Sequence, residues 1–465
     1  MRELWTSIPI DIYPKRAERE QAPNILHGDV RFLCSGAEGV GGDGAFQLIA
    51  LFCRRAGSTG INLRITTGEP RARSADARAV VRVFSRLLES IGQWRSVALP
   101  FSLLKLLDEI GCAHRNTALP LLHHLQITDG MTAGIPTKPL SLFANAPNLR
   151  SLEISAIGPR NVKLQWQNLT RLVLRYYSIV PALELLVETG IAARLRYLQL
   201  QGISRYEQLN GRSFGLTLPA LETLVLAHPS HPEFVGELTL PGLKTLDMHT
   251  ISDRDGARGT APAINALSRR SERRSELSTK SREDDFDPRD PDTLSTSAAP
   301  SASTFSGVTS LRLPLTPFHA IERMQIISAF PTLRELTLFA PSGTTQQSEY
   351  STHGVPSMPT PDPWNAFLRT LALQCSPTLG SLLPNLRLLR LDDVPTAIDA
   401  HLLTALVSAA PLDIQIVYKG DLGAAEGEVG ELLDAVKSGK LGLKVVNAPE
   451  RWDFGVDARM VEKFY

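Results

Sequence analysis

The sequence has few cysteines and no long hydrophobic run. Only four cysteines occur in 465 residues (Cys34, Cys53, Cys112 and Cys375), and none forms a Cys-x-x-Cys pair, which excludes a disulfide scaffold. No run of about 18 apolar residues is present, so no transmembrane helix is predicted. The opening residues lack the apolar core of a secretion signal, so an intracellular location is expected.

Excess charge of one sign is also missing. Lys and Arg number 49 and Asp and Glu 48, which gives a net charge of +1. Surfaces for nucleic acid or anionic membranes require a basic excess, so neither is expected as a partner. The hydrophobic fraction of 43% allows a large core. Since ordinary domains have roughly 100–200 residues, the length indicates two or three domains or one long repeat array.

Sequence signatures of catalysis and metal binding are absent as well. We find no nucleophile elbow, no His-Glu-x-x-His motif, no Walker loop and no kinase signature. The segment His228–Glu233 holds two histidines and a carboxylate but lacks a third imidazole or thiolate at ligand spacing. His123 and His124 are adjacent, so their side chains are expected on opposite faces of a strand. We therefore expect no enzyme, no metal and no cofactor.

What the sequence does have is a repeated leucine pattern, Leu-x-x-Leu-x-Leu, often preceded by Pro-x. Six copies carry the proline: Pro120–Ile127, Pro147–Ile154, Pro219–Leu226, Pro241–Met248, Pro331–Leu338 and Pro384–Leu391. The first apolar positions of the other copies are Trp94, Leu169, Leu195, Val308 and Leu368. Most successive copies begin roughly 20–29 residues apart, which is the period of leucine-rich repeats.

Each copy ends with alternating apolar and polar residues, which is typical of a strand with one buried face. Helical stretches follow several copies, at Leu103–Ile110, Pro181–Thr189, Ile321–Ile327 and His401–Val407. The sequence thus predicts an α/β leucine-rich-repeat solenoid, a horseshoe with concave strands and convex helices. An all-helical repeat array is the alternative, and the two-residue alternation disfavours it. Regular repeats place Asn or Cys three residues after the last leucine, and its replacement here predicts irregular turns without an asparagine ladder.

Composition divides the chain into five parts. Residues 1–93 form a repeat-like N-terminal region, residues 94–250 and 307–420 are leucine-rich repeats, and residues 421–465 are a helix–strand tail. Residues 251–306 are charged and poor in apolar residues, so we expect a disordered insertion between two repeats. Its basic run, Arg269–Arg274, is interpreted as a solvated linker, with a nuclear-import patch or kinase target as the alternative.

A glycine-rich segment suggests a different function. Gly39–Gly44 matches the G-x-G-x-x-G spacing of dinucleotide-binding loops, follows the strand-like Val30–Cys34 and precedes the helix-like Phe46–Phe52. A nucleotide-binding enzyme is therefore one alternative. The loop from Cys34 is longer than a tight phosphate turn, and leucine repeats rather than a second parallel-sheet half follow it. A glycine-rich loop ahead of a helix is the simpler interpretation.

Three N-terminal segments resemble fungal F-box/leucine-rich-repeat proteins. Leu4–Ile10 resembles the strand that opens the repeats of that family, Gln47–Ile65 its next helix–strand pair, and Leu87–Leu99, with Gln-Trp-Arg-Ser, a further unit. The resemblance implies a leucine-rich horseshoe that recognises substrates for a Skp–cullin ubiquitin ligase. The F-box itself has no counterpart here, so a Skp-type adaptor is expected only if an F-box exists upstream. A stand-alone structural or regulatory scaffold is the alternative.

The pattern also locates candidate binding residues. Positions three, five and seven of each repeat point away from the core, and Tyr and Arg often anchor protein interfaces. We therefore expect a non-catalytic module, a monomer, that binds a protein through its concave face. The candidate residues on this face are Arg171, Arg175, Tyr197, Gln199, Asp247, Glu335, Phe339 and Arg390.

Overall fold

The computed structural model places the chain in two compact units, Met1–Leu221 and Glu222–Tyr465, each built on a parallel β-sheet. It describes residues 7–12, 32–33, 47, 50–51, 53–67, 84–85, 87–109, 118–128, 138–203, 215–227, 232–249, 259–272, 307–316, 318–340, 363–374, 383–392, 400–409, 412–418 and 443–447.

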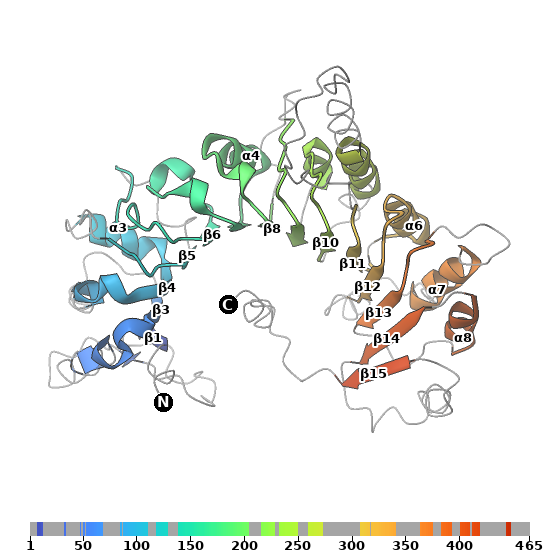
Figure 1. Ribbon diagram of the computed structural model, residues 1–465, viewed down its shortest axis with the longest axis horizontal. Helices are drawn as coiled ribbons and strands as arrows, with labels where there is room; N and C mark the ends of the chain where they lie inside the picture. The colour runs from blue at the N-terminus through green and yellow to red at the C-terminus, as the bar shows by residue number, and fades with distance from the viewer. Residues whose placement is uncertain are drawn as a thin grey trace, which may run out of the picture. The chain divides into compact units, whose positions relative to one another are not determined.

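In the first unit nearly every strand lies beside the next one along the chain (Figure 1). The strands are β1 (Ser7–Ile12), β2 (Phe32–Leu33), β3 (Ile61–Thr67), β4 (Trp94–Pro100), β5 (His124–Thr128), β6 (Ser151–Ser155), β7 (Arg171–Arg175) and β8 (Tyr197–Gln201). Only β2 departs from chain order, because it pairs with β1 at the sheet edge, outside β1 and β3.

The second unit repeats this arrangement in strict chain order. Its strands are β9 (Thr223–Ala227), β10 (Thr245–Met248), β11 (Ser310–Pro314), β12 (Glu335–Phe339), β13 (Leu388–Asp392), β14 (Asp413–Tyr418) and β15 (Leu443–Asn447). All neighbouring pairs are parallel and in register. Every leucine pattern except the one at Leu368 contains a strand, which confirms the predicted alternation of parallel strands with helical connections, while the predicted horseshoe curvature stays a prediction.

Helical segments connect the strands, and within each unit they lie on one side of the sheet (Figure 1). The α-helices are α3 (Phe101–Glu109), α4 (Ile179–Glu188), α6 (Ala320–Ser328), α7 (Pro363–Gln374), α8 (Ala400–Ala409) and an insertion helix, residues 259–272. The short 3-10 helices are η2 (Gly57–Thr59), η3 (Ile91–Gln93), η4 (Pro159–Asn161), η5 (Trp166–Asn168), η6 (Ile191–Ala193) and η7 (Pro232–Glu237). The side of each sheet without helices is called the open face below.

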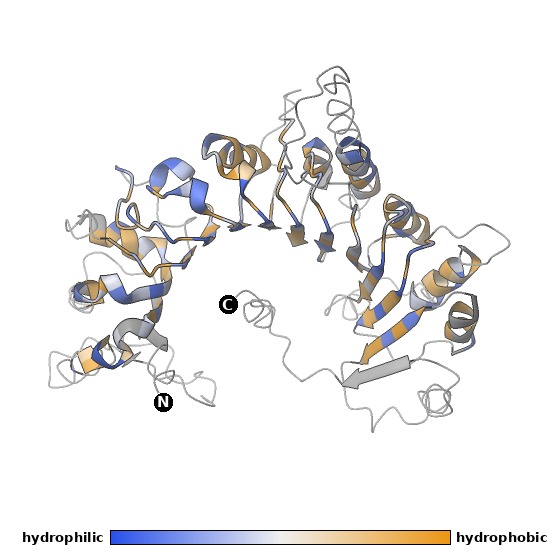
Figure 2. Ribbon diagram, viewed as in Figure 1, coloured by the Kyte–Doolittle hydropathy of each residue, from blue (hydrophilic) through white to orange (hydrophobic). Residues whose placement is uncertain are grey.

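The leucines form columns that run across the strands. Leu125, Leu152, Leu172 and Leu198 are Cα partners on β5 to β8, and each is fully buried. In the second unit the equivalent column is Leu224, Leu246, Leu311, Leu336 and Leu389. Burial of a leucine is worth about 1.5–3 kcal/mol, so such columns supply much of the stability. The alternation of apolar and polar residues along the strands is visible in Figure 2.

The turn before each strand is held by one repeated hydrogen-bond pattern. The carbonyl of the second repeat position accepts two consecutive backbone N–H groups from the next repeat. His123 O accepts from Arg150 N and Ser151 N, both at 3.0 Å. The same arrangement recurs at the carbonyls of Arg150, Thr170, Glu222, Lys244, Thr309 and Arg334. The otherwise buried peptide groups of the turn are thereby satisfied.

An asparagine ladder is present, contrary to the prediction, but it occupies another position. The residue just before the first leucine donates to the carbonyl of the preceding repeat. Asn148 Nδ2 donates to Pro120 O at 2.7 Å, Asn168 Nδ2 to Pro147 O at 3.3 Å and Asn385 Nδ2 to Pro331 O at 3.0 Å. The prediction failed because it considered only the position after the strand, whereas here the ladder ties the turns before the strands.

The turns after β6, β7 and β8 also share one conformation, so the predicted irregularity does not hold there. Ala156, Tyr176 and Gly202 are the eighth residues of their repeats, and their φ angles are 51°, 57° and 62°. Gly202 is required by packing as well, because a Cβ there would lie 2.8 Å from Cδ1 of Tyr176. Backbone bonds from Ala156 N to Arg175 O and from Tyr176 N to Gln201 O connect these turns.

The insertion predicted to be disordered, residues 251–306, contains an ordered helix. Residues 259–272 are helical, and Ala261, Ile264 and Leu267 are buried. Ser271 Oγ accepts the Leu240 N–H at 3.1 Å, and Ser268 Oγ donates to Ala329 O at 2.8 Å. The prediction failed because serines occupy part of the buried helix face, which hides its periodicity. The remaining residues of the insertion lie outside the described part of the chain.

Two further differences concern the repeats. Leu368 begins no strand and lies instead within α7, because a Leu-x-x-Leu spacing also fits the buried face of a helix, as Leu368 and Leu371 show. Strand β14 was not predicted, although Ile414 and Ile416 alternate with polar residues as in the other strands. The predicted helix within residues 421–465 lies outside the described residues.

The ladder can be tested at its shortest bond. Asn148→Asp keeps the size of the side chain but removes the N–H that Pro120 O accepts. We expect the variant to lose about 0.5–1.5 kcal/mol of unfolding free energy, measured by urea denaturation. Asn148→Ala should cost about the same, whereas unchanged stability in both variants would show that the ladder contributes nothing.

The packing of the insertion helix can be tested at Ile264. Ile264→Ala should lower the unfolding free energy by about 2–5 kcal/mol, because the side chain is fully buried. Arg269→Ala, on the exposed side of the same helix, should change stability by less than about 0.5 kcal/mol. Equal, negligible effects of the two substitutions would support the disordered insertion instead.

Candidate functional site

The eight candidate residues lie on the open faces, divided between the two units. Arg171, Arg175, Tyr197 and Gln199 belong to β7 and β8 of the first unit. Asp247, Glu335, Phe339 and Arg390 belong to β10, β12 and β13 of the second. In the first group, register places Arg171 opposite Tyr197. In the second group no two members are opposite each other, since Glu335 faces Leu388 and Arg390 faces Thr337. The structure thus defines two separate clusters.

A buried carboxylate organises the first cluster. Glu153 on β6 is only 4% exposed, although it occupies an outward position. Its Oε1 accepts from Gln126 Nε2 at 2.7 Å and forms an ion pair with Arg175 Nε at 2.7 Å. A buried charge requires such partners, so Arg175 balances the charge of Glu153. Arg175 is among the predicted site residues and Glu153 is not, because nothing in the local sequence shows that neighbouring strands cover Glu153.

A stacked pair lies beside this carboxylate. The Arg171 guanidinium lies over the ring of Tyr197, with 4.0 Å from Cζ to the ring centroid. The Tyr197 hydroxyl donates to Gln199 Oε1 at 2.9 Å. Three of the predicted residues therefore form one contact series. Cation–π stacking and the hydrogen bond hold the rings and the guanidinium in place, so the surface is organised before any ligand binds.

His124 completes the row of position-three residues on β5 to β8. Its Nδ1 lies 2.9 Å from Ser151 Oγ, within hydrogen-bond distance. Burial, and secondarily the positive charge of Arg171, lower the pKa of His124 to about 4. The imidazole is therefore neutral at pH 7, and it adds no charge to the cluster.

The second cluster is an ion-pair network. Arg312 on β11 lies between two carboxylates, with Nη1 3.9 Å from Asp247 Oδ2 and Nη2 3.7 Å from Asp392 Oδ2. Arg390 Nε is 2.6 Å from Asp392 Oδ1, and His249 Nε2 is 3.3 Å from Asp247 Oδ2. Both arginines of this network therefore have acidic partners within the protein. Arg312 and Asp392 were not among the predicted site residues.

Phe339 was predicted as an exposed anchor, and this was wrong. Its side chain is only 4% exposed. The Arg312 guanidinium covers the ring at 4.8 Å, and the His249 ring lies 6.0 Å away, centroid to centroid. Long polar side chains on adjacent strands bury an outward aromatic residue in this way. Glu335, by contrast, is exposed at the start of β12.

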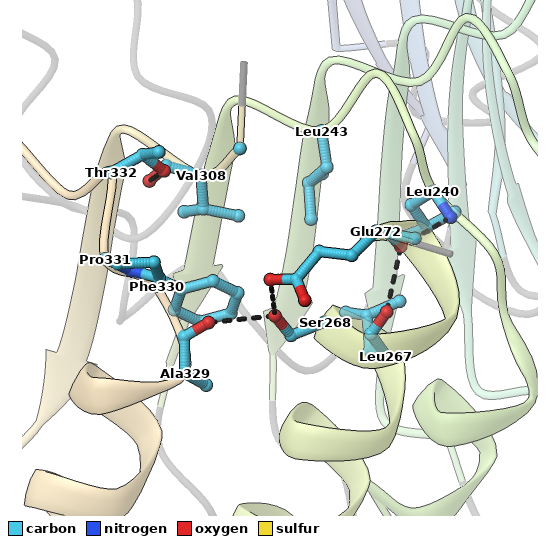
Figure 3. A pocket seen from close by; sticks show the side chains of 12 residues that line it. Leu240, Leu243, Leu267, Ser268, Glu272, Val308, Ala329, Phe330, Pro331 and Thr332 are labelled. Carbon is cyan, nitrogen blue, oxygen red and sulfur yellow. Dashed lines mark hydrogen bonds between the residues drawn. The ribbon is translucent and has the colours of Figure 1, made fainter. Parts of the chain in front are cut away.

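A small pocket lies away from these clusters, between the insertion helix and the turn before β12 (Figure 3). Its volume is about 200 Å³, and its lining includes Leu240, Leu243, Val308 and Phe330. The polar atoms at its wall are satisfied within the protein, since Ser268 Oγ donates to Ala329 O at 2.8 Å and lies 3.2 Å from Glu272 Oε1. The pocket therefore offers few directional contacts to a ligand.

The remaining motifs give no site in the described part of the chain. Gly39–Gly44 and His228–His231 lie outside the described residues. Among the described residues, no group of three or more His, Cys, Asp or Glu side chains could hold a metal ion. No described helix is long and apolar enough to cross a membrane.

Comparisons with known proteins name no family. No family model matches the sequence, and no curated protein matches it. Among solved structures, the TLR13–ssRNA13 complex is similar, with 14% identity and a TM-score of 0.31. The match covers 77% of this chain and 35% of that chain, so this chain spans about a third of the other's length. The resemblance to F-box proteins stays a prediction.

The low pKa of His124 predicts a pH dependence of stability. An unfolded histidine has a pKa of about 6.5, so below that pH the unfolded chain binds a proton that the folded chain does not. The contribution of the neutral His124 ring to the unfolding free energy is fully present above pH 6.5, and it is lost as the pH falls towards 4. At pH 5 the loss should be about 2 kcal/mol.

His124→Asn should remove this part of the pH dependence. The unfolding free energies of the wild type and the variant are measured from pH 8 to pH 5. Over this range the wild type should lose about 2 kcal/mol more than the variant. Parallel curves would contradict the assigned pKa.

Proposed function

We propose that this protein is a non-catalytic protein-interaction module that binds its partner through the open face of the first unit. The observation that carries the proposal is the fixed Arg171–Tyr197–Gln199 series on adjacent strands. Tyrosine and arginine held on a rigid sheet are the residues that most often dominate the free energy of protein binding. The open face of the second unit has polar groups of its own, Glu335 and the Arg312 network.

The finer part of the proposal concerns the partner. The resemblance of Gln93–Ser96 and the flanking segments to F-box proteins supports an intracellular role in substrate recognition for a Skp–cullin ubiquitin ligase. In that role the repeats bind the substrate, and a Skp-type adaptor is a partner only if an F-box exists upstream. A stand-alone scaffold would use the same open face without any ligase.

The open face is tested by variant-dependent binding. Proteins that crosslink to the wild-type chain are identified, and the affinity of each is then measured with variants. Tyr197→Ala should weaken binding of the true partner by about thirtyfold, which corresponds to the roughly 2 kcal/mol typical of an anchor residue. Val187→Ser, at a 53% exposed position on α4, should leave the affinity unchanged.

A partner that is lost with Val187→Ser and kept with Tyr197→Ala would overturn the proposal. The ligase role is tested separately. Inhibition of cullin ligases in the native cell should increase the lifetime of the identified partner, whereas an unchanged lifetime would favour the stand-alone scaffold.

A further inference from the structure

Arg171 is a half-buried cation whose hydrogen-bond donors have no acceptor within the described residues. Its guanidinium contacts the Tyr197 ring, and neither an ion pair nor a hydrogen bond joins it to any described side chain. Three other half-buried arginines of the open faces differ from it, because Arg175, Arg312 and Arg390 each have a carboxylate partner. A guanidinium carries five N–H donors, and none of those of Arg171 is both buried and unpaired, so they are accessible to a ligand.

The surrounding residues leave this positive charge uncompensated. Glu153 provides the negative charge at the outward positions of β4 to β8, and Arg175 is paired with it at 2.7 Å. His124 is neutral at pH 7, because burial, and secondarily the charge of Arg171, lower its pKa. The outward face of these strands therefore has one positive charge in excess, located at Arg171.

The geometry at Arg171 matches a planar anion. Tyr197 covers one flat side of the guanidinium, so the N–H groups along its edge remain available for two parallel hydrogen bonds. Ser151 and His124, on the adjacent strands of the same row, add polar groups beside it. A phosphate carries about −1.5 to −2 charge and usually needs more than one cation. A carboxylate carries −1, which equals the excess charge here.

We propose that Arg171, positioned by Tyr197 and flanked by Ser151 and His124, is a subsite for a single aspartate or glutamate side chain of the protein partner. This inference rests on the proposed function and specifies the chemistry of its binding face. The ion-pair network of the second unit has no such subsite, because Arg312 and Arg390 are already occupied by Asp247 and Asp392.

The subsite can be tested on the wild-type chain by NMR of arginine Nε–Hε groups. The probe is glutamate capped at both termini, and capped glutamine is the neutral control. The Arg171 signal should shift saturably with capped glutamate, with a midpoint on the order of tens of millimolar, and should not shift with capped glutamine. The exposed Arg196, one residue before β8, should shift at least about tenfold less.

The Arg171 signal is assigned by its loss in Arg171→Lys, or in Arg171→Gln if the lysine variant does not fold. Equal, unsaturable shifts at Arg171 and Arg196 would overturn the proposal, as would the absence of any shift. Tighter binding of capped phosphoserine by tenfold or more would also overturn it in favour of a phosphate site.

The outcome is independent of the test of the proposed function. If crosslinking identifies a partner that depends on Tyr197 but glutamate does not bind, the subsite is wrong and the interaction module stands. If glutamate binds at Arg171 but no partner depends on the open face, the subsite stands and the proposed function is wrong.

Discussion

The structure depends on one backbone arrangement, in which a single carbonyl accepts two consecutive N–H groups from the next repeat. At His123, Thr170 and Lys244 this contact fixes where the following strand begins, whatever the length of chain between the two repeats. Once the start of the strand is fixed, parallel pairing brings the leucines into columns. Hydrophobic burial then stabilises a register that the hydrogen bonds have already defined.

The sequence predicted the strands well because their signal is local and repeated. Prediction from the sequence was less reliable where the same leucine spacing fits both a strand repeat and a helix. Leu368 and Leu371 fit the first two leucine positions of the pattern, but both lie on the buried face of α7. Leu373, at the third leucine position, is 65% exposed, so the pattern does not continue as a buried strand face. The insertion helix was missed for the opposite reason. Its buried apolar residues, Ile264 and Leu267, are followed on the same face by buried serines, so average composition indicated disorder.

For the candidate site, too, the sequence predicted some features and not others. Position in the repeat predicted which residues leave the core, and all of the candidates except Phe339 are at least partly exposed on the open faces. Exposure depends on long-range neighbours, however, and this explains both Phe339, covered by Arg312, and Glu153, covered by Gln126 and Arg175. No pattern along the chain could reveal that Arg175 would be paired and Arg171 would not, because the deciding carboxylate is on another strand.

The hydrogen bonds at Lys244 bear on how a repeat protein can accept inserted sequence. Lys244 O accepts from Thr309 N and Ser310 N, so the bonds between β10 and β11 are the same as those between repeats that follow each other directly. The entropic cost of closing a loop rises only slowly with its length. New sequence can therefore accumulate at a repeat boundary at little expense to the sheet, and the insertion helix shows that such an addition can acquire a packed structure of its own.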